Sequence, residues 1–497
     1  MHFDMSQFDS YREDNRREVK KAKGGLPLSL WETYSAFANC YGGVIILGVK
    51  ENHDGSWNMT GLESASKLKK DFWNVINDKK KVSINLLMDK DVKVYEENGK
   101  VILVIRVPRA KREQKPVYIN GNIFDGTFRR NWEGDYHCDR SEVLAMLRDQ
   151  PEETADMKIL EDMSLDVLHE ETIHAYRNRH IAFRREHVWE RLEDNEYLER
   201  IGAAKISAKD GKLHPTAAGL LMFGEEYKIL YEFPEYFLDY REVLDPTIRW
   251  TDRLQSSSGD WTGNLFDFFF RVYGKLVKDL KIPFKLEGIT RIDDTPVHKA
   301  LREALANCLV NTDFYFQRGI VIRKDVNSIT MENPGNIRTG KEQMLKGGIS
   351  DPRNKALMKM FNLIGIGERA GSGVPDIYSV WKQQGWEPPE VIEEYGPDRT
   401  ILKLSFVKSA DKKVLIKSAD KKVLIKSADK KTVTKKTEQQ LEDILGKMDF
   451  NKEYKTSEIA KFIDVKETRA RTLLKELVKQ GKIKAIGKNK GRRYIRK

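Results

Sequence analysis

The sequence has few cysteines and no long apolar segment. Cys40, Cys138 and Cys308 are the three cysteines among 497 residues, and no two of them form a CxxC pair. Such spacing gives neither a disulfide framework nor a zinc cluster, so we expect a reducing compartment, the cytoplasm. The longest clean apolar run, residues 44–49, is far shorter than the roughly 20 residues that span a bilayer. The first residues lack the apolar segment of a secretory signal, and no membrane partner is expected.

Positive charge is concentrated at the carboxyl end of the chain. The formal charge is +12, from 88 Lys and Arg against 76 Asp and Glu. Residues 401–497 hold 29 Lys and Arg and 12 Asp and Glu, a net of +17, and the first 400 residues carry −5. A hydrophobic content of 40% is enough to build packed cores. The composition therefore predicts a near-neutral folded body with a tail suited to a polyanion.

The length and the breaks in pattern predict an α+β multidomain protein with four segments. Residues 1–150 end at an amphipathic helical stretch followed by proline, and residues 155–405 mix helical patterns with short strands. The nine-residue unit KSADKKVLI occurs twice in succession from Lys408 and begins again at Lys426. Because a repeat this polar cannot stack a core, residues 406–436 are interpreted as a lysine-rich linker before a domain at 437–497.

Local patterns in the first segment predict particular elements. Residues 28–39 read as a helix that stops at Gly42-Gly43, and residues 44–49 as a buried strand. Asn98-Gly99 between two apolar runs predicts a hairpin.

The pattern after Thr437 predicts a winged helix-turn-helix. The pattern consists of an apolar stripe, then a short helix at 457–462, then a longer helix at 468–479, and finally a glycine-tipped basic hairpin. Residues 481–497 contain eight cations and no acid, a density suited to phosphate neutralisation. A protein-binding winged helix is the alternative. The side chains expected to reach DNA or RNA are Lys466, Thr468, Arg469, Arg471, Thr472, Lys475, Lys488, Lys490, Arg492 and Arg493.

Residues 8–150 carry a recognisable signature. SAFANCYGG is followed by VIILGV and an acidic turn and is preceded by ExxxxExK. This order resembles the Alba-like domain shared by Schlafen proteins and many bacterial regulators. The resemblance implies that Glu13, Glu18 and Glu51 hold Mg²⁺ or Mn²⁺ for phosphodiester cleavage, although the family's nucleases have Asp at the third position. A solvated charged face, or nucleic-acid binding without cleavage through Lys20, Arg129 and Arg130, remains an alternative.

One helix of the middle segment carries polar residues on an unusual face. Glu303, Asn307 and Asn311 recur four residues apart, opposite the apolar positions of residues 296–313. Asparagine is a poor helix former, so its repeated use there indicates a task.

Five ordered blocks of residues 155–405 supply a context for this helix. They are HPTAAGLLMFG, REALANCLVNTDF, ITMENPG, SDPRNKALMKM and IGERAGSGVPDI. They resemble the RecG-like, GHKL-related ATPase-like α/β sandwich module of bacterial regulators, which implies ATP with Mg²⁺ as a cofactor. No GxxxxGK[ST] occurs, so a P-loop is excluded. The residues expected at the nucleotide are Glu303, Asn307, Asn311, Asp313, Gly335, Gly371 and Gly373.

Two functions are compatible with these segments. The first is a DNA-binding transcriptional regulator, a homo-oligomer in which the ATPase-like module binds nucleotide or dimerises. The second is a Schlafen-like metal-dependent endonuclease that cleaves RNA such as tRNA, or DNA, in phage defence. We favour the first, because the winged-helix pattern can be read without any family.

Overall fold

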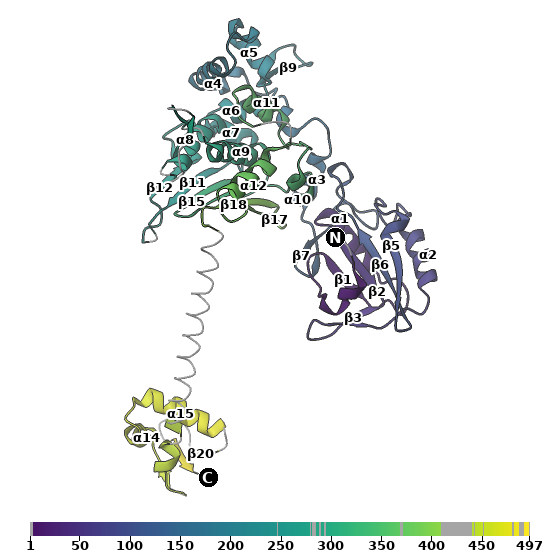
Figure 1. Cartoon of the computed structure of the whole chain (residues 1–497), viewed down its shortest axis with the longest axis vertical. Coiled ribbons are helices and arrows are strands. Elements are labelled where there is room, and N and C mark those ends of the chain that lie inside the picture. The colour runs from purple at the N-terminus through teal and green to yellow at the C-terminus, as the bar shows by residue number, and fades with distance from the viewer. Residues whose placement is uncertain are drawn as a thin grey trace. The chain divides into compact units, whose positions relative to one another are not determined.

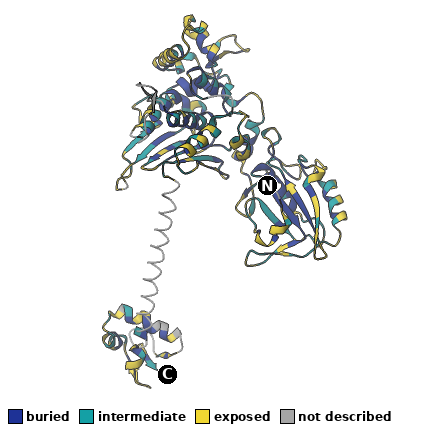
Figure 2. Ribbon diagram, in the orientation of Figure 1, coloured by how far each residue is buried: buried dark blue, intermediate teal, exposed yellow. Residues whose placement is uncertain are grey.

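The computed structural model describes residues 3–245, 247–278, 280, 285–287, 290–292, 295–367, 371–408, 440–441, 443–450, 452–479, 482–486 and 492–496. The chain forms two compact units, Met1–Val407 and Lys408–Lys497. Each unit has its own apolar core, visible as dark blue ribbon in Figure 2. The predicted linker lies almost entirely outside the described residues.

The amino-terminal part of the first unit is a four-stranded sheet flanked by helices. The strand order is β1-β2-β6-β5, with β1 and β2 parallel and the other pairs antiparallel. Apolar side chains pack on both faces of this sheet. The elements are β1 (Arg17–Lys20), α1 (Ser29–Asn39), β2 (Gly43–Leu47), β3 (Val49–Glu51), β4 (Trp57–Met59), α2 (Ala65–Ile76), β5 (Val92–Glu97), β6 (Lys100–Val107), β7 (Phe128–Asn131), β8 (Gly134–His137) and α3 (Arg140–Asp149).

Two local predictions for this part can be compared directly. The hairpin at Asn98-Gly99 is confirmed: both residues have positive φ, and β5 pairs with β6 around them. The strand predicted at 44–49 is wrong in extent, because the chain turns at Gly48. Gly48 has φ +92°, and its carbonyl accepts hydrogen bonds from the N–H groups of Thr60 and Gly61 at 2.8 and 2.9 Å. The strand therefore divides into β2 and β3.

The central part is built on a six-stranded sheet of order β12-β11-β15-β16-β18-β17. Helices lie on one face of this sheet (Figure 1). Its helices are α4 (Glu170–Phe183), α5 (Asp194–Ile201), α6 (Ala217–Phe223), α7 (Glu226–Glu232), α8 (Leu265–Val277), α9 (Pro296–Val310), α10 (Lys341–Lys346), α11 (Lys355–Leu363) and α12 (Gly373–Gln383). The strands of the central part, which include the six of this sheet, are β9 (Ala204–Ile206), β10 (Leu213–Pro215), β11 (Leu238–Val243), β12 (Asp252–Gln255), β13 (Lys285–Glu287), β14 (Thr290–Ile292), β15 (Ile320–Asp325), β16 (Ser328–Pro334), β17 (Glu390–Glu394) and β18 (Arg399–Ser405).

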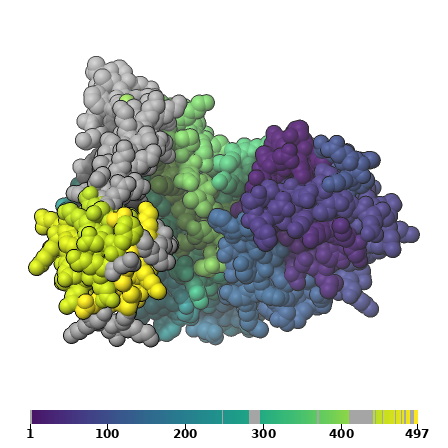
Figure 3. Space-filling model, turned by 90° about the horizontal axis from the view of Figure 1, so that it is seen from below, coloured from purple at the N-terminus to yellow at the C-terminus, as the bar shows by residue number. Residues whose placement is uncertain are grey.

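Helix α9 is central to this arrangement because its apolar face is completely covered. Pro296 occupies its first turn, where the missing N–H costs nothing. Leu301, Leu305 and Leu309 are fully buried in the main core. The amino-terminal and central parts touch directly, as the purple-blue and green surfaces in Figure 3 show.

The second unit contains helical residues at 440–447, of which 442 is not described, followed by two further helices and a three-stranded sheet. The sheet order is β19-β21-β20, and Ile459, Leu474 and Tyr494 belong to its core. The elements are β19 (Glu453–Tyr454), α14 (Thr456–Phe462), α15 (Glu467–Lys479), β20 (Ile483–Ile486) and β21 (Arg493–Arg496). The described residues therefore give a mixed α+β chain, and the winged-helix assignment of the tail stays a prediction.

Candidate functional site

The polar face of α9 lines a cavity with a free volume of about 160 Å³. Glu303, Asn307 and Asn311 all contribute to its wall. Asn307 Nδ2 donates to Glu303 Oε1 at 3.0 Å, and Asn311 Nδ2 donates to the carbonyl of Asn307 at 2.9 Å. The four-residue spacing thus places one carboxylate and two amides along one side of the cavity.

Two glycines form the facing wall, next to the start of α12. A Cβ at Gly373 would lie 2.0 Å from Glu303 Oε1, and one at Gly371 would lie 2.8 Å from the backbone nitrogen of Ile349. Gly371 also has φ +68°. Only glycine therefore allows Glu303 to approach the amino end of α12, where the helix dipole favours negative charge.

The sheet supplies the floor of the cavity. Asn333 on β16 and Thr400 on β18 line it, and Asn333 is almost completely buried. Asn333 Nδ2 donates to the carbonyl of Pro334 at 3.2 Å, and Thr400 Oγ1 donates to that of Gly335 at 2.8 Å. The rest of the lining is largely apolar, including Met331, Ile337, Met344, Ile349, Met358, Val374, Ile377, Val391 and Leu402.

Two residues expected at this cavity lie elsewhere. Asp313 does not line it, because its carboxylate pairs with Arg148 at 3.0 Å. Gly335 is not among the lining residues; its φ is +99°, and a Cβ there would lie 3.0 to 3.1 Å from the guanidinium of Arg353. The structure thus places both outside the lining of this cavity, and a contact of either with nucleotide stays a prediction.

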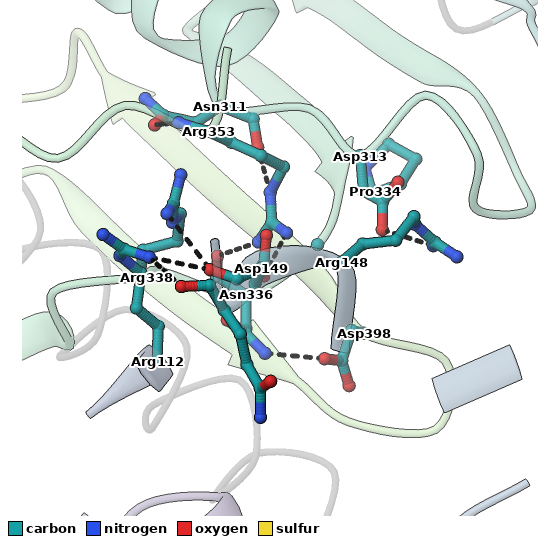
Figure 4. Close-up of polar contacts among 12 residues, drawn as sticks. Arg112, Arg148, Asp149, Asn311, Asp313, Pro334, Asn336, Arg338, Arg353 and Asp398 are labelled. Carbon is teal, nitrogen blue, oxygen red and sulfur yellow. Dashed lines mark hydrogen bonds and ion pairs between the residues drawn. The ribbon is translucent and has the colours of Figure 1, made fainter. Parts of the chain in front are cut away.

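A buried network of arginines joins α3 to the cavity wall (Figure 4). Arg353 forms an ion pair with Asp149, and it also donates to the carbonyls of Asn336 at 2.9 Å and Asn311 at 3.1 Å. Arg338 donates to the carbonyl of Asp149 at 3.3 Å. Asp149, the last residue of α3, is therefore held by residues that belong to the cavity or touch it.

Two arginines of the segment after β6, Arg109 and Arg112, form ion pairs and hydrogen bonds with the same cavity wall. Arg112 Nε lies 2.9 Å from Asp351, which lines the cavity. Arg109 pairs with Glu393 at 2.9 Å and donates to the carbonyl of Ile337 at 2.7 Å. Glu393 in turn accepts from the N–H of Ile337 at 2.9 Å. The peptide groups of Ile337 are thus fixed on both sides by one ion pair.

Two buried titratable groups lie close to this network. Burial raises the pKa of Asp398 to about 6, opposed by Lys115 and by the hydrogen bond from Asn336 Nδ2 at 2.7 Å. Burial, reinforced by Arg109, lowers the pKa of Lys115 to about 8, and its ammonium donates to the carbonyl of Asn39.

Glu13, Glu18 and Glu51, the three carboxylates predicted near the amino terminus, lie close enough to affect one another electrostatically. Burial, followed by repulsion from Glu18, raises the pKa of Glu13 to about 7, and Glu51 adds to the shift. Both carboxylate oxygens of Glu18 are already in ion pairs, one with Lys20 and the other with Arg130, each at 2.9 Å. Glu13 accepts from the N–H of Val19 at 2.9 Å. Within the described residues no three His, Cys, Asp or Glu side chains form a group that could hold a metal ion, so this arrangement does not fit Mg²⁺ or Mn²⁺.

The cations expected beside these carboxylates have internal partners. The side chain of Arg130 is completely buried between Glu18 and Asp135, at 2.9 and 2.8 Å, which corrects its prediction as a surface contact for nucleic acid. Arg129 pairs with the buried Glu142 at 3.1 Å, and Lys20 pairs with Glu18.

The tail residues differ in what the structure describes of them. Lys466, Arg471, Thr472, Arg492 and Arg493 are exposed. Arg469 is half-buried and donates to Gln440 Oε1 at 3.1 Å. The side chains of Thr468 and Lys475, and all of Lys488 and Lys490, lie outside the described residues.

Comparison with known families bears on the first unit. Residues 10–138 match the family described as Schlafen, AlbA_2, and residues 318–400 match "Putative ATP-dependent DNA helicase recG C-terminal". The predicted Schlafen and RecG-like resemblances are thereby confirmed, and they indicate a nucleic-acid-related function. Residues 144–239 match a domain of unknown function, DUF8451. No curated protein matches the chain.

Two solved structures are similar to parts or most of the chain. The DIP2311 protein from Corynebacterium diphtheriae is 16% identical over 97% of this chain and 95% of its own, with a TM-score of 0.40. The N-terminal domain of a putative ATP-dependent DNA helicase RecG-related protein from Nitrosomonas europaea is 28% identical over 27% of this chain and 89% of its own, with a TM-score of 0.22. None of the helices in the described ranges is long and apolar enough to cross a bilayer.

Sequence reasoning missed the residues that support the cavity. Asp351 and Arg353 lie inside the block SDPRNKALMKM, so a signal was present although neither residue was assigned a role. Arg109 and Arg112 gave no signal, since nothing in their local sequence shows that their partners lie more than 200 residues away.

Proposed function

We propose that the chain, a Schlafen AlbA_2 domain joined to a RecG C-terminal-like module, is a nucleic-acid-binding regulator whose α9 cavity binds a nucleotide. The observation that carries the proposal is the convergence of Glu303, Asn307 and Asn311 on one cavity opposite Gly371 and Gly373. A slot with apolar walls suits a planar base, and a few convergent polar groups fix its orientation.

The residues present fit ATP with Mg²⁺. Glu303 and Asn307 offer the oxygen ligands that Mg²⁺ prefers, and Gly371 and Gly373, which have no side chain, line the cavity at the amino end of α12, where phosphate is favoured. When bound, the metal would neutralise phosphate charge. The protein's own contribution is to hold Glu303 by the Asn307 amide and to exclude water with the apolar wall.

A nucleotide-protection melt tests this part of the proposal. ATP with Mg²⁺ at one hundred times its dissociation constant stabilises the folded protein by about 2.7 kcal/mol, which raises Tm. Asn307→Ala should abolish the rise. Lys299→Ala is the matched control, because Lys299 is exposed on the same helix and does not line the cavity. Equal Tm shifts in all three proteins, or no Tm shift in the wild type, would contradict ATP binding in this cavity.

The tail is proposed to contact DNA through the exposed cations of α15 and β21. Binding to a duplex should weaken steeply with salt, because each phosphate contact releases counterions. A chain lacking residues 437–497 should lose most of this binding, whereas undiminished binding would contradict the assignment. The regulator is further proposed to be a homo-oligomer, which light scattering with and without ATP would measure.

A second candidate is cleavage of RNA or DNA by Glu13, Glu18 and Glu51. The observation that favours it is the proximity of the three carboxylates, with the pKa of Glu13 raised to about 7. Because their present arrangement does not fit a metal, the regulator is preferred. Incubation with Mn²⁺ and labelled tRNA or DNA, beside Glu18→Ala, distinguishes the two: cleavage abolished by the substitution would favour the nuclease.

A further inference from the structure

Six lysines between residues 67 and 81 stand out against the slightly acidic body. They are Lys67, Lys69, Lys70, Lys79, Lys80 and Lys81, which we call the α2 lysine cluster, and the same interval contains two acids, Asp71 and Asp78. All six lie on α2 or on the turn that follows it. Five are exposed and Lys69 is half-buried.

The folded structure does not use these cations. Among the described residues, no carboxylate lies within ion-pair distance of any of the six ammonium groups, and no ammonium donates a hydrogen bond. Other lysines of the same unit do have such partners: Lys158 pairs with Glu232 at 2.6 Å, and Lys100 donates to the carbonyl of Met59 at 2.8 Å. Among the described residues, these six ammonium groups are therefore open to an external ligand.

The position of three lysines argues against a stabilising role. Lys67, Lys69 and Lys70 lie in the first half of α2, and the first turn of this helix contains no acid. Positive charge in the first turn of a helix, where Lys67 lies, opposes the helix dipole, and Lys69 and Lys70 in the next turn gain nothing from it. Lys79–Lys81 follow the carboxyl end, where the same effect is favourable. Helix stability thus explains the second group and not the first.

The exposed face of α2 has the chemistry of a phosphate-contacting helix. Leu68, Phe72 and Ile76 are buried in the domain, so the apolar stripe is already covered. The opposite face presents Lys67, Lys70 and Asn74, three and four residues apart, all exposed. Figure 2 shows the outer side of this helix, at the right edge, in yellow and teal. Since none of the apolar side chains of α2 is exposed, an anionic membrane surface is a poorer match than nucleic acid.

We propose that the α2 lysine cluster, with Asn74, is a second nucleic-acid-binding surface of the chain, separate in sequence from the basic tail. Its ligand is the phosphate backbone, and the side chains give position rather than sequence specificity. This inference rests on the proposed nucleic-acid-binding function and names a site for it within residues 1–150.

Lysine acetylation mapped by mass spectrometry, on the full chain with and without a 30-base-pair duplex or a single strand of equal length, tests the site directly. Lys67, Lys70, Lys79 and Lys80 should be protected by nucleic acid, whereas the exposed Lys90 and Lys93 should react equally in both samples. Protection confined to tail lysines would overturn the inference and leave the proposed function intact. Absence of any binding would instead contradict the proposed function.

A variant with these four lysines changed to alanine provides the energetic test. Its log–log salt slope for duplex binding should be smaller by about 3 to 4 than that of the wild type, because each duplex contact contributes about 0.9. Lys90→Ala with Lys93→Ala is the matched control and should keep the wild-type slope. A Tm equal to or above that of the wild type would show that the four-alanine protein folds. An unchanged slope in it, or loss of binding to phosphatidylserine vesicles with duplex binding intact, would overturn the inference.

Discussion

Removing the carboxylate of Asp149 should destabilise the first unit much more than breaking an exposed ion pair. The Asp149 side chain is 15% exposed and that of Arg353 is 7% exposed. Loss of one partner from a buried pair costs about 3 to 5 kcal/mol, because the remaining charge is left without compensation. Residual exposure of Asp149 favours the lower end, so we expect about 3 kcal/mol for Asp149→Ala.

Substitution of the other partner, Arg353, should lower the free energy of unfolding more. Arg353 also donates to the carbonyls of Asn336 and Asn311. Arg353→Ala removes these donors, and each buried group left unpaired costs about 1 to 3 kcal/mol. We therefore expect about 5 kcal/mol for Arg353→Ala. The double variant should cost less than the sum of the single variants by about 2 kcal/mol, since the partners are in direct contact.

Urea unfolding of the four proteins, followed by tryptophan fluorescence, measures these differences, provided that the m-value is unchanged. Glu196→Ala is the matched control: Glu196 pairs with Arg200 at 3.2 Å, but the two side chains are 47% and 57% exposed. That exposed pair should contribute no more than about 0.5 kcal/mol. If Asp149→Ala costs as little as Glu196→Ala, or if the coupling is below about 0.5 kcal/mol, the buried network does not stabilise the fold as argued.

Three further outcomes are expected. Gly373→Ala should abolish nucleotide protection in the thermal melt, because its Cβ would lie 2.0 Å from Glu303 Oε1, whereas Gly274→Ala meets no atom within 4 Å and should behave as wild type. Since the folded pKa of Glu13, about 7, exceeds its ordinary 4.5, stability falls as pH rises between these values, and Glu13→Gln should flatten that part of the pH–Tm profile. A chain ending at Val407 should melt within about 2 °C of the first-unit transition of the full chain by calorimetry, because each unit has its own core.

The sequence predicted best what depends on one element. The spacing of Glu303, Asn307 and Asn311 placed them on one face of a helix, and the structure brings all three to one cavity. Asn98-Gly99 specified its own turn. In both cases the geometry follows from neighbours within a few residues.

It predicted poorly what depends on partners distant along the chain. Asp313 was expected at the nucleotide, but its partner Arg148 lies 165 residues away. Arg130 was expected to contact nucleic acid, yet its side chain is buried between Glu18 and Asp135. Burial of a charge requires opposite charges nearby, and local pattern does not show which ones will be adjacent.

The ion pair around Ile337 determines where this protein can be divided. A cut at residue 150 would separate Arg109 from Glu393 and Arg112 from Asp351, and it would free the Ile337 carbonyl from its donor. A fragment starting near residue 155 would then keep every residue that lines the cavity but lose the contacts of Arg109 and Arg112 with one of its walls. Met1–Val407 is therefore better suited to ligand screening or crystallisation than a fragment that lacks residues 1–150, and a negative binding result with such a fragment would say nothing about the intact pocket.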